Sequence, residues 1–289
     1  MSVPDRRILV VGGTGTVGGE VVRLLRGARI PVRALVRDPF AASRIAGPGV
    51  ELIQGDLGAP ETLAPALRDI RRVFLVTSSG PGTVPLQTAM IHAAADAGVE
   101  RLVRISVLGV GQPVPAGILE WHGAVEATLA ASGVPGVNLR PTSMMQNLLS
   151  SAEVIRRAGQ FFGSQGDGKV AFVDARDVAA AAVGALTRAT HVTEDVALTG
   201  PAPLSYGEVA ETLTDILGRP VRYVDLPREA FRASLAAAGL PEWLAADLSL
   251  LEDASRGTTM PLSDGVLRLA GSPPRTLRTF LEDHRALLA

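Results

Sequence analysis

The stretch ILVVGGTGTVGGEVVRLL, Ile8–Leu25, decides the fold of this chain. Four apolar residues lead into a cluster of glycines, and helix-forming residues follow, so the stretch predicts a strand, a tight turn and a helix. Gly13, Gly15 and Gly18 match the pattern G-x-G-x-x-G, and Gly12, Gly15 and Gly18 match G-x-x-G-x-x-G equally well. Taken alone, glycines at this spacing also fit a turn that only connects the strand to the helix.

Short β-branched runs continue to alternate with helical patterns as far as about residue 200. Further strands are expected at residues 32–36, 50–54, 73–77, 102–107, 136–139, 170–173 and 196–199. Helices are expected between them at residues 17–26, 60–68, 84–97, 119–132 and 175–187. Strictly alternating units of this kind predict an α/β fold with a doubly wound parallel sheet. In that setting, a glycine turn after the first strand favours a dinucleotide site over a plain turn.

After Gly200 the rhythm of the sequence changes. Helical patterns at residues 205–217, 228–238 and 275–288 surround one strand-like run at residues 221–224. We therefore expect a smaller, mostly helical C-terminal lobe. The nucleotide-binding part is assigned to residues 1–145 plus about 170–200, and the smaller substrate-side lobe to about 146–169 plus 201–289.

The composition narrows the possible functions. A formal net charge of -1 in 289 residues gives no general reason to bind nucleic acid or an anionic membrane. The absence of cysteine excludes disulfides and thiolate chemistry. His92, His191 and His284 lack partners at a metal-ligand spacing, so no metal site is expected. The first apolar run, Ile8–Val11, is too short for a signal-peptide core, and no stretch approaches the roughly 20 apolar residues of a membrane helix, so a cytoplasmic protein is expected.

Glycine at the turn lets the backbone approach a pyrophosphate, and the free amides of the following helix act as donors. The residues expected to contact it are Gly12, Gly13, Thr14, Gly15, Thr16, Val17 and Gly18. The end of the second strand selects the nucleotide, since an acidic residue there binds a ribose hydroxyl and an arginine accommodates a 2′-phosphate. Arg37 favours NADP(H) over NAD(H). Asp38 as the selector is the open alternative, and Arg44 is a candidate second phosphate ligand.

Eight stretches together resemble the NmrA-like atypical short-chain dehydrogenase/reductases, a group that includes type 2 quinone oxidoreductases. They are VVGGTGTVGGEVV, ALVRDP, ELIQGDL, VFLVTSS, RLVRIS, HGAVEATLAASGVP, LRPTSMMQNLL and VAFVDARDVAAAAV. The resemblance covers Ile8 to about Leu186, which is most of the nucleotide-binding part, and it implies a Rossmann-type fold.

The resemblance also implies roles for residues that follow the later strands. Asp56 and Leu57 would line the adenine, and Thr77, Ser78 and Ser79 would lie along the ribose and pyrophosphate. Ser106 would lie near the nicotinamide, Pro141 would form a wall of its pocket, and Thr142–Asn147 would begin the substrate side. A plain turn role for Asp56 and a purely structural role for Ser106 are open alternatives.

Most members of the wider superfamily use a Tyr-x-x-x-Lys pair, and this chain cannot form one. Its tyrosines, Tyr206 and Tyr223, have no lysine four residues on, and Lys169 is the only lysine. Alignment with the family places His122 at the lysine position and Ile118 at the tyrosine position. His122 is a candidate to bind the ribose or donate a proton, because a pKa near neutrality suits both tasks. Packing or solvent exposure is its alternative role.

These features lead to a hypothesis of function. An NADPH-dependent reductase of a quinone or similarly conjugated apolar small molecule needs positioning more than a built-in acid. The substrate pocket is expected to be lined by Met144, Met145, Phe161, Phe162 and Trp121, together with Asn147, although such apolar residues also serve as core. A nucleotide-sensing regulator that controls a protein partner without turnover is the competing hypothesis.

Overall fold

The structure, a computed structural model, describes residues 7–188 and 194–289. Its main feature is a seven-stranded sheet with the order β3-β2-β1-β4-β5-β6-β8, in which every neighbouring pair is parallel. The strands are β1 (Ile8–Val11), β2 (Val32–Val36), β3 (Val50–Gln54), β4 (Arg72–Leu75), β5 (Arg101–Ile105), β6 (Gly136–Pro141) and β8 (Val196–Leu198). This arrangement confirms the predicted doubly wound parallel sheet.

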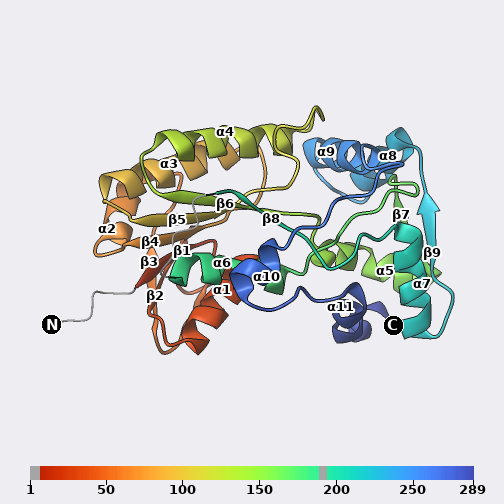
Figure 1. Ribbon diagram of the computed structural model, residues 1–289, viewed down its shortest axis with the longest axis horizontal. Coiled ribbons are helices and arrows are strands. Elements are labelled where there is room, and N and C mark those ends of the chain that lie inside the picture. Colours follow the sequence, from red (N-terminus) through yellow and green to blue (C-terminus); the bar gives the residue numbers. More distant parts are fainter. Residues whose placement is uncertain (1–6, 189–193) are drawn as a thin grey trace.

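Helices cover both faces of this sheet, which is why its central strands are buried along their whole length (Figure 1). One face carries α1 (Thr16–Gly27), α6 (Ala175–Thr187) and α10 (Gly265–Ala270). The other carries α2 (Leu63–Leu67), α3 (Thr83–Asp96) and α4 (Gly117–Ala131). Short 3₁₀ turns, η1 (Ser43–Ile45) and η2 (Pro60–Thr62), precede β3 and α2.

The C-terminal lobe has a core of its own. Two parallel strands, β7 (Gln160–Gly163) and β9 (Arg222–Asp225), form a second sheet. Around it lie η3 (Met145–Ser151), α5 (Ala152–Ala158), α7 (Tyr206–Leu217), α8 (Arg228–Ala237), α9 (Glu242–Asp253), α11 (Leu277–Asp283) and α12 (Arg285–Leu288). The core of the lobe includes Met145, Val170 and Phe172, which the sequence assigned to the nucleotide-binding part.

Two expected elements are wrong. Residues 170–173 form only isolated bridges, because Val170 pairs with Leu204 and Val173 pairs with Met144, so no single partner strand extends the ladder. The helix expected at residues 275–288 is divided into α11 and α12 at His284, whose backbone leaves the helical conformation.

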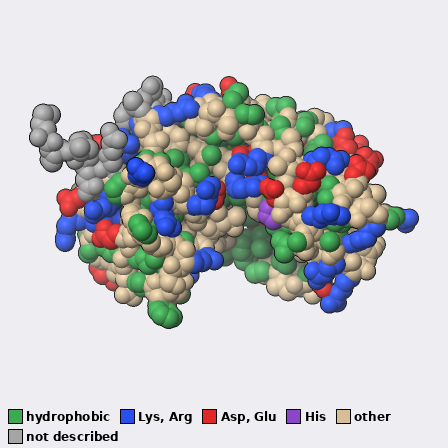
Figure 2. Space-filling model, turned by 90° about the horizontal axis from the view of Figure 1, so that it is seen from below, with side chains coloured by type: hydrophobic (Ala, Val, Ile, Leu, Met, Phe, Trp, Pro, Cys, Tyr) green, Lys and Arg blue, Asp and Glu red, His purple; other side chains and the backbone are tan. Residues whose placement is uncertain are grey.

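All seven strands of the large sheet end at the same edge, which faces the C-terminal lobe (Figure 1). Viewed from below, the molecule is hollowed between the part that carries this sheet and the lobe, and apolar side chains lie in the hollow (Figure 2). In open parallel sheets, ligands bind beyond the carboxyl ends of the strands. Within residues 7–188 and 194–289, no helix combines the length and apolarity needed to span a bilayer.

Candidate nucleotide site

The turn after β1 contains two positions where only glycine fits. Gly12 has a φ of +80°, and a Cβ atom there would lie 2.2 Å from the carbonyl oxygen of Val76. A Cβ atom on Gly18 would lie 2.1 Å from the carbonyl oxygen of Gly12, so α1 packs directly against the turn. At Gly15 the same atom would make only an ordinary contact of 3.4 Å. The backbone therefore requires the outer two glycines of G-x-x-G-x-x-G.

The outer surface of the turn is open. Thr14, Gly15 and Thr16 are exposed, and Gly15 is the N-cap of α1, with no side chain to accept from the first helical amides. Free amides and the helix dipole favour an anionic group at such a position. Arg44 of η1 donates to the carbonyl oxygen of Thr14, so a guanidinium lies at the rim of the turn.

Charged residues follow β2 and β3 at the same edge of the sheet. Arg37 is exposed, and none of the described side chains pairs with its guanidinium. By contrast, the carboxylate of Asp38 accepts a 2.8 Å hydrogen bond from the amide of Phe40. The carboxylate of Asp56 likewise accepts a 2.8 Å bond from the amide of Gly58. The two acidic groups thus stabilise local turns, whereas the charge of Arg37 is available to a ligand.

The loop after β4 lies next to β1, where the order of the strands reverses. Ser78 and Ser79 are exposed on it, and Thr77 is half-buried. The hydroxyl of Thr77 accepts a 2.7 Å hydrogen bond from Nε2 of Gln87 on α3. The hydroxyl of Ser79 lies 3.3 Å from Nε2 of His122 on α4. Both hydroxyls are therefore held by side chains from the helices above the sheet.

His122 is buried, with only 5% of its surface exposed. Its Nδ1 lies 2.6 Å from a guanidinium nitrogen of Arg104 on β5. Burial, and then the charge of Arg104, lower the pKa of His122 to about 3. The expectation of a pKa near neutrality is therefore wrong: the ring is neutral at physiological pH, and a protonated His122 is not an available acid.

Ser106, at the end of β5, is buried as well. Its hydroxyl donates a 2.5 Å hydrogen bond to Glu126 on α4, and that carboxylate also accepts from Arg140. Arg140 in turn pairs with Asp195, so the hydroxyl belongs to an ion-pair network beside β6. These contacts explain the burial of Ser106 without a nicotinamide. Its predicted place near that ring stays a proposal.

The residues predicted to line a substrate pocket are separated by the fold. Met145 and Phe161 are 1% and 2% exposed and belong to the core of the C-terminal lobe, which is the alternative that their sequence context left open. Met144 is half-buried against the core of the large sheet, and Asn147 is exposed. Pro141 is buried at the end of β6. Met145 and Phe161 are therefore core residues of the lobe.

Helix α9 contributes two residues that the sequence did not identify. Asp247 accepts hydrogen bonds of 3.0 and 2.8 Å from the amides of Gly117 and Ile118, and so caps α4. The ring of Trp243 meets Trp121 edge to face, with centroids 5.3 Å apart. These contacts join segments more than 100 residues apart, and no local pattern predicts them.

A Cβ atom on Gly80 would lie 3.5 Å from the ring of Trp243. The pair of indoles therefore stands beside the β4 loop, and Trp121 directly precedes His122 in the chain. This places aromatic surface at the edge of the sheet where the glycine turn and Arg37 also lie.

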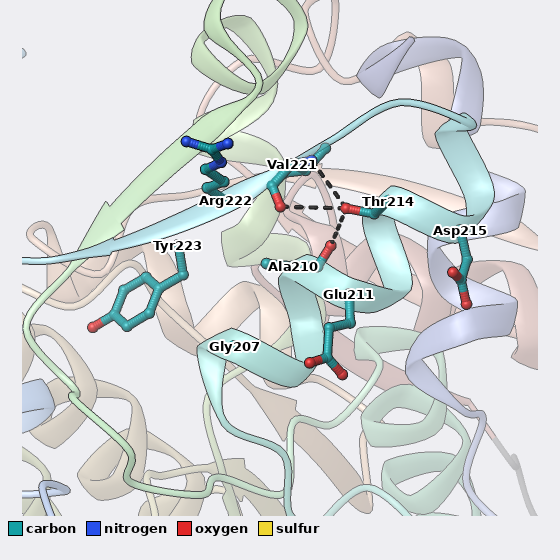
Figure 3. A pocket seen from close by; sticks show the side chains of 8 residues that line it. All are labelled: Gly207, Ala210, Glu211, Thr214, Asp215, Val221, Arg222 and Tyr223. Atoms are coloured by element: carbon teal, nitrogen blue, oxygen red, sulfur yellow. Dashed lines mark hydrogen bonds between the residues drawn. The ribbon is translucent and has the colours of Figure 1, made fainter.

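Two other hollows lie away from this edge. One, of about 450 Å³, is formed by α7 and β9 in the C-terminal lobe and includes Glu211, Asp215 and Arg222 (Figure 3). The other, of about 560 Å³, lies between α4 and β6 and includes Glu126 and Asp195. Neither contains a residue of the glycine turn or of the loops after β2, β3 and β4, and we assign no nucleotide to them.

No group of three His, Asp or Glu side chains in the described ranges could hold a metal ion. His191, one of the histidines considered above, lies outside those ranges.

Comparison with known proteins agrees with this architecture. The chain is 41% identical over 280 residues to an NAD(P)H azoreductase of Xenophilus azovorans, covering 96% of this chain and 98% of the relative. An NADPH-dependent quinone oxidoreductase of Escherichia coli, solved with NADPH, superposes with a TM-score of 0.89 at 32% identity, covering 96% and 99%. A triphenylmethane reductase of Citrobacter sp., solved with NADP(H), superposes with a TM-score of 0.86 at 25% identity, covering 97% and 100%.

These relatives are named as NAD(P)H-dependent oxidoreductases, the enzyme class that the sequence predicted. The model of the NmrA-like family matches residues 4–258, which is most of the chain. This protein therefore belongs to the NmrA-like family.

Proposed function

We propose that this chain is an NADPH-dependent reductase of planar, conjugated small molecules such as quinones and azo compounds. The observation that carries the proposal is the open glycine turn, built around Gly12 and Gly18, together with Arg37, whose guanidinium pairs with no side chain in the described part of the chain. The turn offers main-chain amides to a pyrophosphate, because Gly15, the N-cap of α1, has no side chain that could accept from them.

Arg37 and Arg44 are the proposed ligands of the 2′-phosphate that distinguishes NADPH from NADH. Arg37 follows β2, the strand whose end selects the nucleotide in this fold. Arg44 is held at the rim of the turn through the carbonyl oxygen of Thr14. A planar guanidinium can bind a phosphate through two parallel hydrogen bonds. NAD(P)H is named in the azoreductase relative, and NADPH or NADP(H) is named with both solved neighbours.

Bound NADPH would supply a hydride, and neither residue at the positions of the Tyr-x-x-x-Lys pair is an acid that could supply the proton. Ile118 occupies the position of the absent tyrosine, and His122 is neutral and hydrogen-bonded on both ring nitrogens. The site therefore suits acceptors that stabilise the charge left by hydride addition and take their proton from water. A quinone does so as a phenolate-type anion.

Trp121, Trp243 and Met144 are the proposed apolar wall for the acceptor. Flat aromatic faces and an adaptable thioether recognise planar, conjugated molecules without directional hydrogen bonds. The names of the relatives fit this chemistry, since azo dyes, quinones and triphenylmethane dyes are all extended conjugated acceptors.

The test is the oxidation of NADPH, followed by the loss of its near-ultraviolet absorbance. The acceptors are a naphthoquinone, a benzoquinone, an azo dye and a triphenylmethane dye. We expect turnover with at least one of them and a loss of turnover in the Gly18→Ala variant. Tight binding of NADPH without oxidation by any acceptor would contradict the proposal and favour the sensing function.

A further inference from the structure

Arg104 is a buried cation without a direct counter-ion. Its side chain is 0% exposed, and its three hydrogen bonds go to neutral groups: Oε1 of Gln87 at 2.5 Å, Oδ1 of Asn138 at 3.1 Å and Nδ1 of His122 at 2.6 Å. None of the described carboxylates contacts the guanidinium; Asp195 reaches it only through Asn138. Burial lowers the pKa of Arg104 to about 10, so it stays charged at neutral pH. A charge in this setting is costly for folding.

The guanidinium fixes the direction of every hydrogen bond around it, because arginine has donors and no acceptor. Nδ1 of His122 must therefore accept, and the ring proton lies on Nε2, which donates to Ser79. Oε1 of Gln87 must also accept, and its amide nitrogen donates to Thr77. Two chains of hydrogen bonds thus run outward from Arg104, one through α4 and one through α3.

Both chains end on hydroxyls of the β4 loop. The oxygens of Thr77 and Ser79 accept from within the protein, and their own protons have no acceptor among the described residues. Ser79 is exposed and Thr77 is half-buried, so both protons can be donated to a bound molecule. A pair of hydroxyls oriented in this way suits an oxygen that only accepts hydrogen bonds, such as a phosphate or a carbonyl oxygen.

We infer that Arg104 is a positioning residue that turns the hydroxyls of Thr77 and Ser79 into outward donors for an acceptor oxygen of the ligand. The inference rests on the proposed function in taking that ligand to be NADPH or its electron acceptor. His122 then acts as a fixed donor of the neutral Nε2–H form and is not a proton shuttle. Because Arg104 is itself fully buried, its charge is poorly screened and further favours a negatively charged ligand oxygen.

The other charged groups near Arg104 do not compete for this role. Glu126 lies one turn after His122 on α4 and binds Ser106 and Arg140. Asp195, beside β6, binds Asn138 and Arg140. Both carboxylates are therefore engaged with other groups, and Arg104 is the charged group in direct contact with His122.

The first test reads the tautomer of His122 without cofactor or turnover. In ¹⁵N-labelled protein at neutral pH, the His122 ring, assigned by its loss in the His122→Gln variant, is expected to show an unprotonated Nδ1 and a protonated Nε2. In Arg104→Met, which keeps a long side chain without its charge, the tautomers should mix and the pKa should rise toward 6.5. An unchanged tautomer and an unchanged pKa in Arg104→Met would overturn the inference.

The second test measures the dissociation constant of NADPH and the KM of a naphthoquinone, which distinguishes a phosphate oxygen from a substrate carbonyl. Arg104→Met and Ser79→Ala should both raise the same one of these two constants by about tenfold. The double variant should raise it little more than Arg104→Met alone. Fully additive losses, or no loss in either constant, would contradict the role.

A third pair of variants covers the case in which Arg104→Met does not fold. Glutamine at position 122 can accept from Arg104 and donate to Ser79, whereas leucine can do neither. His122→Gln should therefore recover most of the affinity or KM that His122→Leu loses. Equal losses would instead support a proton-shuttle role. If the wild type itself does not bind NADPH, the proposed function fails. The tautomer measurement on His122 then still tests the direction of the hydrogen bonds around Arg104.

Discussion

At Gly18 a single hydrogen atom in place of a side chain lets α1 pack against the turn that precedes it. A Cβ atom there would lie 2.1 Å from the carbonyl oxygen of Gly12, so Gly18→Ala must displace either the helix or the turn. We expect a loss of about 2–4 kcal/mol in unfolding free energy and a large loss of NADPH affinity. Urea unfolding and a binding titration measure both effects.

Gly27→Ala is the matched control, since it lies in the same helix and a Cβ atom there meets nothing within 4 Å. This control should keep NADPH affinity and gain up to about 1 kcal/mol of stability. Similar losses in the two variants would show that the close contact at Gly18 is not what shapes the turn.

The sequence predicts some residues of the site better than others, for a physical reason. Gly12 and Gly18 are recognisable because the backbone geometry of the turn restricts these two positions to glycine. Arg104, Gln87 and Asn138 were missed, since their roles depend on contacts between β5, α3 and β6. The available signal was an arginine within a strand whose neighbours predict complete burial, because such a strand is otherwise apolar.

At the scale of elements, α9 connects the C-terminal lobe to the nucleotide-binding part. Trp243 meets Trp121, and Asp247 caps α4. If the indoles form the substrate wall, Trp243→Leu should raise the KM of a naphthoquinone about fivefold or more while NADPH affinity stays unchanged. The chain has two tryptophans, so quenching of their fluorescence by the quinone reports on this wall directly.

Phe162→Leu is a control for that variant, because Phe162 is an exposed aromatic residue of β7 and takes no part in the wall. An unchanged KM in Trp243→Leu, or an equal change in Phe162→Leu, would exclude Trp243 from substrate binding.

Elements were predicted well where local pattern and tertiary pairing agree. β1, β2, β3 and α6 begin and end at the expected residues, since the apolar runs of β1 and β2, the alternation that begins the edge strand β3 and the amphipathic pattern of α6 are strong local signals. Residues 170–173 have the composition of a strand, but their backbone partners, Leu204 and Met144, come from two different segments. β7 was missed because its partner, β9, lies about 60 residues further along the chain.

For the whole molecule, two groups with shifted pKa values, His122 and the half-buried Glu252 of α9, make stability depend on pH in opposite directions. The pKa of His122 falls from 6.5 to about 3, so the unfolded chain binds a proton that the folded state does not, and stability decreases as pH drops from 6.5 toward 3. Burial raises the pKa of Glu252 from 4.5 to about 7, so its contribution decreases as pH rises from 4.5 to 7.

Urea unfolding of the wild type, His122→Gln and Glu252→Gln from about pH 4 to 8 separates the two effects. Relative to the wild type, His122→Gln should gain stability as pH falls below 6.5, and Glu252→Gln should gain it as pH rises above 4.5. Each slope is at most about 1.4 kcal/mol per pH unit. Profiles parallel to that of the wild type would contradict the two shifted pKa values.

Recognition of a dinucleotide with an extra phosphate is the claim on which the proposed function depends. Calorimetric titration of NADPH and NADH into the wild type, Arg37→Ala and Arg68→Ala tests it most directly. Arg68 is an exposed arginine between α2 and β4, at the opposite edge of the sheet, and serves as the control. We predict that Arg37→Ala weakens NADPH about tenfold or more and NADH less than about twofold, while Arg68→Ala changes neither. Equal weakening of both nucleotides, or no weakening of NADPH, would contradict the account.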